Sequence, residues 1–342
     1  MQPFIIFPLA SAFVFLVLRQ LGRRRSNLPL PPGPRGLPLV GNLRDIAGIG
    51  GDPWVTYNQW SQVYGDVLHF KVLGHHTVVL NSYEATNDLL DKKSYNYSDR
   101  PGESTRPLEF LGTCRILTIS QIDMPMFIDL MRFGWNFAVM RYSDQWRLHR
   151  RTFNQFFQSR VISQYNDIQR AATVKLMQNL EASPEDFFQH VKHQSGSILL
   201  KIVYGYTLQA KDDPYLELFH EAQEGIGAAA IIGSFWIDYF PVLKYLPSWL
   251  PGTSFKRKAK VWKQQLIDMK EKPWGWLIQA TEHGTGEASF ATRSIDRLSV
   301  TLGEGSTMED VIKDCAAVAY FAGADTVSKN MVEAETLGLI LN

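Results

Sequence analysis

An acid and a hydroxyl lie side by side at Asp325 and Thr326, directly after a run of small residues, in the stretch Ala322-Gly323-Ala324-Asp325-Thr326. A Gly inside a helix costs roughly 1 kcal/mol relative to Ala. Gly323 therefore needs a reason, such as a group pressed against the backbone or a local opening of the hydrogen-bond ladder. Asp325 and Thr326 could then bind or deliver a chemical group. The alternative is a core helix that tolerates its Gly.

The residues before this stretch predict the helix that positions it. Apolar side chains recur at three- and four-residue steps, which is typical of one buried helix face, at Met308, Val311, Ile312, Cys315, Val318, Ala319 and Ala322. Ser306, followed three positions later by Glu309, is typical of a capping box at a helix start.

A second pair that could do chemistry is Trp146 and Arg150, which are four residues apart and so share one face of a helix. An indole N–H beside a guanidinium offers two donors to a carboxylate or a phosphate. The alternative is a basic, solvated helix face on which Trp146 packs into the core.

Several other chemistries are excluded or weak. The net charge of +1 over 342 residues indicates no general affinity for nucleic acid. Two cysteines, Cys114 and Cys315, exclude a disulfide framework and a Cys-rich zinc site, and fit a body that faces the reducing cytosol. No motif of a serine hydrolase, a zinc protease or a phosphate-binding loop is present. The adjacent His75 and His76 are expected to be turn residues rather than metal ligands.

The N-terminus is expected to be a membrane anchor over residues 1–21. The segment from Pro3 to Leu18 is apolar and uncharged, and the positive charges, Arg19 and then Arg23 to Arg25, follow it. By the positive-inside rule this order predicts a signal anchor whose N-terminus faces away from the cytosol. A cleaved or peripheral segment is the alternative. Residues 22–42 are basic and rich in Pro, so they are expected to form a rigid hinge or a plain linker.

The remaining chain is expected to be mainly α-helical with a small β-sheet, an α+β fold. A hairpin is predicted from two strands, 67–73 and 77–81, with the turn at 74–76. Helices are predicted over 54–64, after a cap at Ser82, and over 143–157, 162–182, 187–204, 215–226 and 256–281. The aromatic, Pro-broken segment Phe235–Pro251 is expected either to pack against the body or to dip into a membrane face.

Taken in order, these motifs resemble those of a cytochrome P450, of the fungal-type membrane-bound branch. The resemblance rests on the anchor and four further stretches, Pro31-Pro32-Gly33-Pro34, Tyr97-Ser98-Asp99-Arg100-Pro101, the Trp146 and Arg150 pair, and Ala322 to Thr326, with a fifth at 243–249. It covers residues 25–326 and implies a partial P450 domain at 43–326 on the endoplasmic reticulum membrane, with the body in the cytosol.

The resemblance also implies roles for single residues. Trp146 and Arg150 would donate to a haem propionate. Ala322 and Gly323 would lie against the haem and oxygen, while Asp325 and Thr326 would help to deliver protons to dioxygen. The implied reaction inserts one oxygen atom into an apolar small molecule, with electrons from NADPH through a reductase on the same membrane. The sequence does not identify the substrate.

The departures from the family pattern concern the iron ligand. The family's thiolate lies in a Phe-x-x-Gly-x-x-x-Cys-x-Gly loop beyond the central helix, and neither Cys114 nor Cys315 has that setting. The Glu-x-x-Arg helix is also missing. We therefore expect an N-terminal fragment that lacks the haem-Cys region, has no protein ligand for the metal and is inactive. The alternative function is a non-catalytic, membrane-tethered truncated fragment.

Two segments depart from the family and suggest how such a chain could arise. Residues 102–122 have neither helical nor strand periodicity, and residues 327–342 form an atypical tail. Codons that match splice borders can encode the ends of 102–122 and the start of the tail. The hypothesis is that both are translated introns. A real surface insertion is the alternative for 102–122.

Overall fold

The computed structural model describes residues 29–47, 49, 53–97, 124–209, 212–230, 234–301 and 306–336, and of these the side chains of 298–301, 306, 307, 325 and 327–336 are not described. The expected anchor, the insertion 102–122 and residues 337–342 of the tail lie outside these ranges. Within them, no helix is both long and apolar enough to cross a membrane. The fold consists of two compact units, one ending at Lys92 and one beginning at Lys93.

The N-terminal unit is built on the predicted hairpin, and its elements are α2 (Leu43–Ala47), α3 (Pro53–Tyr64), β1 (Val67–Val72), β2 (His75–Leu80), α4 (Tyr83–Thr86) and the π-helix η1 (Asn87–Asp91). The strands pair antiparallel, from Val67 with Leu80 to Val72 with His75. Buried Leu68, Phe70 and Val72 alternate along β1 and so face one side. The Ser82 hydroxyl accepts from the amide of Ala85, which confirms the predicted cap.

The expectation that His75 and His76 are turn residues is wrong, because both lie in β2. The turn is shorter and consists of Leu73 and Gly74, with φ of 49° and 92°. Two left-handed residues in a row match the twist of a hairpin, so the strand starts earlier than expected. The imidazoles of His69 and His76 are joined by a 2.8 Å hydrogen bond. Within the described ranges, no three His, Cys, Asp or Glu residues are grouped to hold a metal.

The Pro-rich segment pairs with the hairpin along the outer edge of β1. The His69 amide donates to the Pro32 carbonyl at 2.8 Å, and the Asn42 amide donates to the Lys71 carbonyl at 2.6 Å. The Asn42 side chain accepts from the Lys71 amide at 3.0 Å. A Cβ at Gly33 would collide with the His69 carbonyl, so only Gly allows this approach. Residues 32–42 are thus fixed to the sheet and are not a plain linker.

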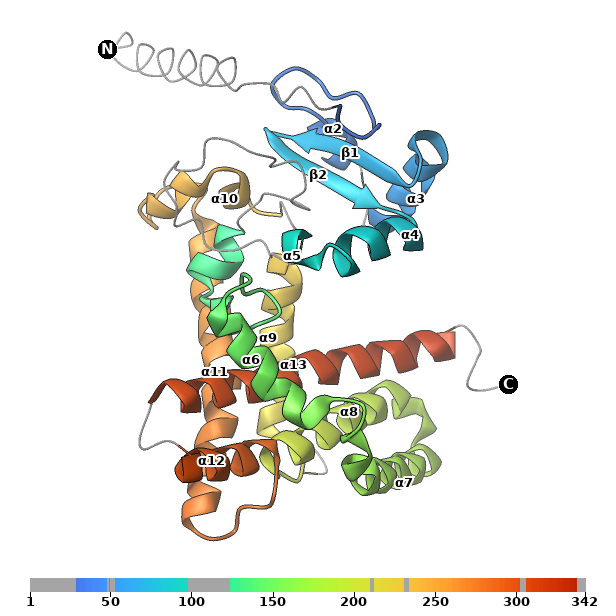
Figure 1. Cartoon of the computed structure of the whole chain (residues 1–342). Coiled ribbons are helices and arrows are strands. Elements are labelled where there is room, and N and C mark those ends of the chain that lie inside the picture. Colours follow the sequence, from blue (N-terminus) through green and yellow to red (C-terminus); the bar gives the residue numbers. More distant parts are fainter. Residues whose placement is uncertain are drawn as a thin grey trace. The chain divides into compact units, whose positions relative to one another are not determined.

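The second unit is helical (Figure 1), and its elements are α5 (Ser94–Tyr97), η2 (Met126–Leu130), η3 (Phe133–Trp135), α6 (Asp144–Phe157), η4 (Ile162–Tyr165), α7 (Asn166–Ala182), η5 (Pro184–Asp186), α8 (Phe187–Tyr204), α9 (Pro214–Ala230), α10 (Trp236–Tyr239), η6 (Pro241–Tyr245), α11 (Ser254–Glu282), α12 (Phe290–Thr301) and α13 (Ser306–Thr336). The predicted helices are confirmed, with 162–182 divided between η4 and α7. The fold class is confirmed as mainly helical with a two-stranded antiparallel sheet.

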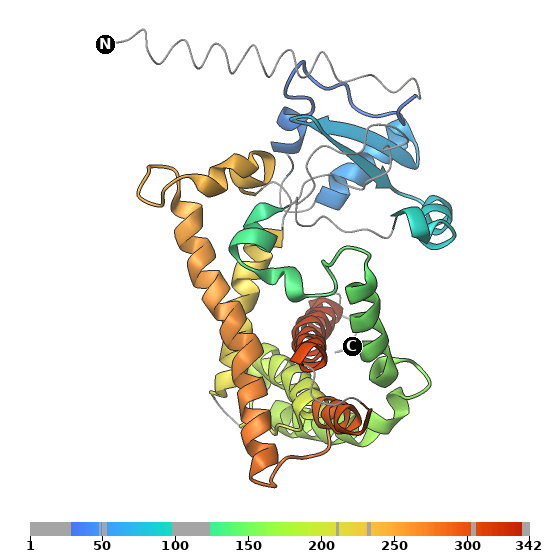
Figure 2. The same cartoon turned by 60° about the vertical axis from the view of Figure 1, so that its left-hand side comes forward.

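The centre of the helical unit is α13, which packs against α6, α8, α11 and α12. Figure 2 shows α13 nearly end-on, with α6 on one side of it. The predicted apolar face is buried from Val311 to Tyr320, which explains why this helix lies inside the unit. The stretch Ala322 to Thr326 therefore lies on a helix that packs against four neighbouring helices.

The segment Phe235–Pro251 is packed against the body in part, and its expected contact with a membrane stays a prediction. Ile237 and Asp238 of α10 are buried, and the Asp238 carboxylate accepts from the Met126 amide at 3.3 Å, so part of the segment is packed. Five large apolar side chains nevertheless stay exposed, at Trp236, Phe240, Val242, Tyr245 and Trp249. We call these five residues the aromatic patch.

Candidate functional site

Gly323 is explained by close packing between two helices. A Cβ at this position would lie 2.6 Å from the Cδ1 of Leu199 on α8. The helix α13 is α-helical along its whole length, so the ladder does not open at the Gly. Of the two reasons considered from the sequence, the pressing group is therefore the one present, and local opening is wrong.

Ala322 and Thr326 lie one turn apart and both are exposed. The Thr326 hydroxyl donates to the Ala322 carbonyl at 2.8 Å, which is the usual bond of a helical Thr to the preceding turn. Its oxygen lone pairs can still accept a hydrogen bond from another group. The side chain of Asp325 lies outside the described ones, so its predicted role stays a prediction.

Trp146 and Arg150 lie on α6, which begins after a cap in which the Ser143 hydroxyl accepts from the Trp146 amide. The two side chains share a face, as predicted, and the Arg150 guanidinium lies 5.9 Å from the Trp146 ring and 5.8 Å from the Phe137 ring. The indole N–H donates to the Phe137 carbonyl at 3.1 Å. The indole N–H is therefore already used within the protein. The Arg150 guanidinium is exposed, so of the two predicted donors it is the one that faces solvent.

A buried ionic cluster joins α6 to α13, and the sequence analysis missed it. The His149 Nε2 lies 3.2 Å from the Asp314 carboxylate, and that carboxylate also pairs with Lys270 of α11. The Cys315 thiol donates to the His149 carbonyl at 3.4 Å. An acid and a histidine at otherwise apolar helix positions are a signal in the sequence, but it does not identify the partner.

Cys315 is a neutral thiol in this setting. Burial, and secondarily the Asp314 carboxylate, raise the pKa of Cys315 to about 12. A thiolate is therefore disfavoured at neutral pH. The expectation that Cys315 is not an iron ligand stays a prediction, and Cys114 lies outside the described residues.

The residues fit a haem on two of its sides. The exposed Arg150 suits an anionic propionate, and the exposed Ala322 with its neighbour Thr326 suits a flat ring that carries a small polar ligand. The family also requires a protein thiolate on the iron; the Cys315 thiol is buried and donates to the His149 carbonyl.

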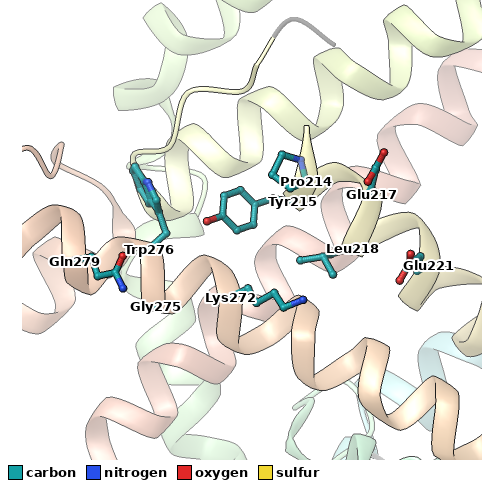
Figure 3. Close-up of a pocket in the computed structure, with 9 residues that line it drawn as sticks. All are labelled: Pro214, Tyr215, Glu217, Leu218, Glu221, Lys272, Gly275, Trp276 and Gln279. Carbon is teal, nitrogen blue, oxygen red and sulfur yellow. The ribbon is translucent and has the colours of Figure 1, made fainter. Parts of the chain in front are cut away.

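Two hollows lie elsewhere in the helical unit. One, of about 530 Å³, lies between α9 and α11 and is lined by Pro214, Tyr215, Glu217, Leu218, Glu221, Lys272, Gly275, Trp276 and Gln279 (Figure 3). The other, of about 350 Å³, is lined by residues that include Phe235, Trp236, Leu243 and Phe255. Neither is lined by a predicted site residue.

Comparison with known proteins decides the family. Residues 31–116 and 120–332 match the family described as cytochrome P450. The chain belongs to the cytochrome P450 family. This P450 chain is 38% identical over 319 residues to a cytochrome P450 monooxygenase of Armillaria gallica, covering 92% of the chain and 58% of that relative. It is 34% identical over 307 residues to the cytochrome P450 monooxygenase COX2 of Coprinopsis cinerea, covering 90% of the chain and 54% of that relative.

A third relative carries a more specific name. The tryptamine 4-monooxygenase of Psilocybe cyanescens is 34% identical over 321 residues, covering 93% of the P450 chain and 58% of the relative. The chain thus spans between half and two thirds of the length of these relatives. All three are named monooxygenases, which supports an oxidoreductase role for the family to which this P450 belongs.

Proposed function

We propose that the chain carries the distal and propionate sides of a haem-dependent monooxygenase that inserts one atom of dioxygen into an apolar small molecule. The observation that carries the proposal is the direct packing of α6, with Trp146 and Arg150, against α13, with Ala322 to Thr326, in a P450 chain. When bound, haem supplies the redox chemistry, with electrons from NADPH through a reductase.

Each side chain then has a separate task. Arg150 holds a propionate by its charge, while Trp146 fixes the guanidinium by stacking and steadies the preceding turn through its bond to Phe137. The exposed Ala322 would leave room for the haem, while Gly323 lets α13 pack closely against α8. The Thr326 hydroxyl accepts a proton from one side and donates on the other when it turns from the Ala322 carbonyl. Asp325 is the source of that proton.

The same proposal includes inactivity of these 342 residues when expressed alone. The pKa of Cys315 is raised to about 12, and Cys114 lacks the sequence around the family's thiolate. The alternative is a non-catalytic role for this chain. The proposed origin of residues 102–122 and 327–342 as translated introns is tested by sequencing the transcript; finding these codons in most mature messages contradicts it.

The decisive experiment is the carbon monoxide difference spectrum of the reduced protein. We expect no thiolate-type band from the 342-residue chain with added haemin. We expect the band from a chimera that continues after Val327 with the C-terminal part of the Armillaria gallica relative. In the chimera, Arg150→Leu should weaken haem retention, whereas Arg151→Leu, its exposed neighbour on α6, should not. A band from the 342 residues refutes inactivity, and a chimera that folds but retains no haem refutes the proposed site.

Membrane attachment is the remaining part of the proposal, with residues 1–21 as the anchor. The aromatic patch supports it, because five large apolar side chains exposed together mark an interaction surface. A variant without residues 1–21 should still bind vesicles of neutral phospholipid, and Trp236→Ser with Trp249→Ser should weaken that binding. Equal binding of both proteins contradicts a lipid role for the patch.

A further inference from the structure

The cluster of His149, Asp314 and Lys270 is the most deeply buried group of charges described in the helical unit. The exposed fractions of the three side chains are 0%, 9% and 15%. They come from α6, α13 and α11, so one carboxylate joins three helices. Burying charges is costly unless they are paired, so each member of the cluster needs partners close by.

Both ring nitrogens of His149 face an oxygen. The His149 Nδ1 lies 2.8 Å from the Gln145 carbonyl, which can only accept, so Nδ1 donates. The Nε2 lies 3.2 Å from a carboxylate oxygen of Asp314. The imidazole is therefore held between two oxygens, one from its own helix and one from α13.

The other carboxylate oxygen of Asp314 pairs with Lys270, whose ammonium lies 4.8 Å from the Trp135 ring. The Asp314 carboxylate is thus shared between His149 and the Lys270 ammonium, and the ammonium also faces the Trp135 ring. Removing the carboxylate would leave a buried ammonium without its ion-pair partner and the His149 Nε2 without its hydrogen-bond partner. Asp314 is therefore the member on which the other two depend.

The cluster lies beside both halves of the proposed haem site. His149 is adjacent to Arg150 and one turn from Trp146 on α6, and Ala322 lies about 12 Å along the axis of α13 from Asp314 at the standard rise. The bond from the Cys315 thiol to the His149 carbonyl adds a second link between the same two helices. A change at the cluster would shift Arg150 relative to Ala322.

We propose that His149, Asp314 and Lys270 form a charge lock that sets α6 against α13, and that His149 and Asp314 are positioning residues for haem binding. The positioning role rests on the proposed function, whereas the lock itself does not. Asp314 holds His149 by a charge-assisted hydrogen bond and is itself held by Lys270. The cluster then fixes the distances between α6, α11 and α13.

The lock is tested first by stability, in the detergent-solubilised 342-residue chain. Asp314→Asn should raise the unfolding equilibrium constant at least about a hundredfold, because it leaves the buried Lys270 ammonium unpaired. Lys270→Met should destabilise the parent protein but stabilise Asp314→Asn, since it then removes the unpaired cation. Asp310→Asn, on the exposed side of α13, is the matched control and should change the constant by less than about threefold. Additive effects of Asp314→Asn and Lys270→Met overturn the lock.

The positioning role is tested by haemin titration followed by the Soret absorbance, at a temperature where all variants are folded. His149→Leu should weaken haemin binding about tenfold, and His149→Gln, whose amide can still donate to Asp314, should restore most of it. Equal haemin affinity in the parent and His149→Leu overturns the positioning role. A parent chain that binds no haemin overturns the proposed site, and the stability cycle then still decides the lock.

Discussion

Replacing Gly323 by Ala sets two opposing effects of known size against each other. In an open helix the change gains about 1 kcal/mol, because Ala loses less backbone entropy on folding. Here the new Cβ would lie 2.6 Å from Cδ1 and 3.1 Å from Cδ2 of Leu199, so α8 or its side chain must shift. Overpacking of this kind costs about 1–3 kcal/mol. We therefore expect a net change between about zero and a loss of 2 kcal/mol in the free energy of unfolding.

The assay is urea unfolding of four proteins, the parent, Gly323→Ala, Leu199→Ala and the double variant. The shorter side chain at 199 makes room for the Cβ, so Gly323→Ala should be about 1–3 kcal/mol more favourable in that background. Gly227→Ala on α9 provides the baseline, because no atom lies within 4 Å of its added Cβ. It should stabilise by up to about 1 kcal/mol. Additivity of the cycle, or a gain at Gly323 equal to that at Gly227, refutes the packing explanation.

Three further outcomes follow from contacts and titrations. Gly225→Ala should be about 1–3 kcal/mol less favourable than Gly227→Ala, because its Cβ would lie 2.6 Å from the rigid indole of Trp262; equal unfolding midpoints contradict this. Since the pKa of Cys315 is raised to about 12, the folded chain should resist alkylation there up to pH 9 and react on unfolding, as located by peptide mass spectrometry. Burial lowers the pKa of His69 to about 4, below its unfolded value, so its contribution to stability should be complete above about pH 6.5 and lost toward pH 4; a His69→Asn variant with the same pH profile of unfolding contradicts it.

Local signals in the sequence were sufficient to predict most helices and strands. They were insufficient to predict the turn of the hairpin and the contacts between helices. The predicted helix 187–204 coincides with α8, because the apolar period runs through the segment and Gly205, in the left-handed conformation, directly follows it. The hairpin turn was misplaced because Leu73, an ordinary residue, adopts a positive φ that no composition rule reveals.

The candidate site shows the same division. The shared face of Trp146 and Arg150 follows from helical spacing alone. The partner of Asp314, by contrast, is 165 residues away along the chain, and Leu199 reaches Gly323 only through the packing of α8 on α13. Contacts of that kind depend on the tertiary arrangement of the helices. Periodicity can therefore predict which residues are buried but not which residues contact each other.

The pairing of residues 32–42 with the edge of β1 has a consequence for biosynthesis. A strand with an unpaired edge can join the strand of a neighbouring chain, and crowded nascent chains on one message are exposed to this hazard. The covering segment precedes the hairpin in the sequence, so it leaves the ribosome before β1 is made. Its prolines have no N–H with which to extend the sheet further. Residues 32–42 can therefore cover this edge of the hairpin as soon as the strands form.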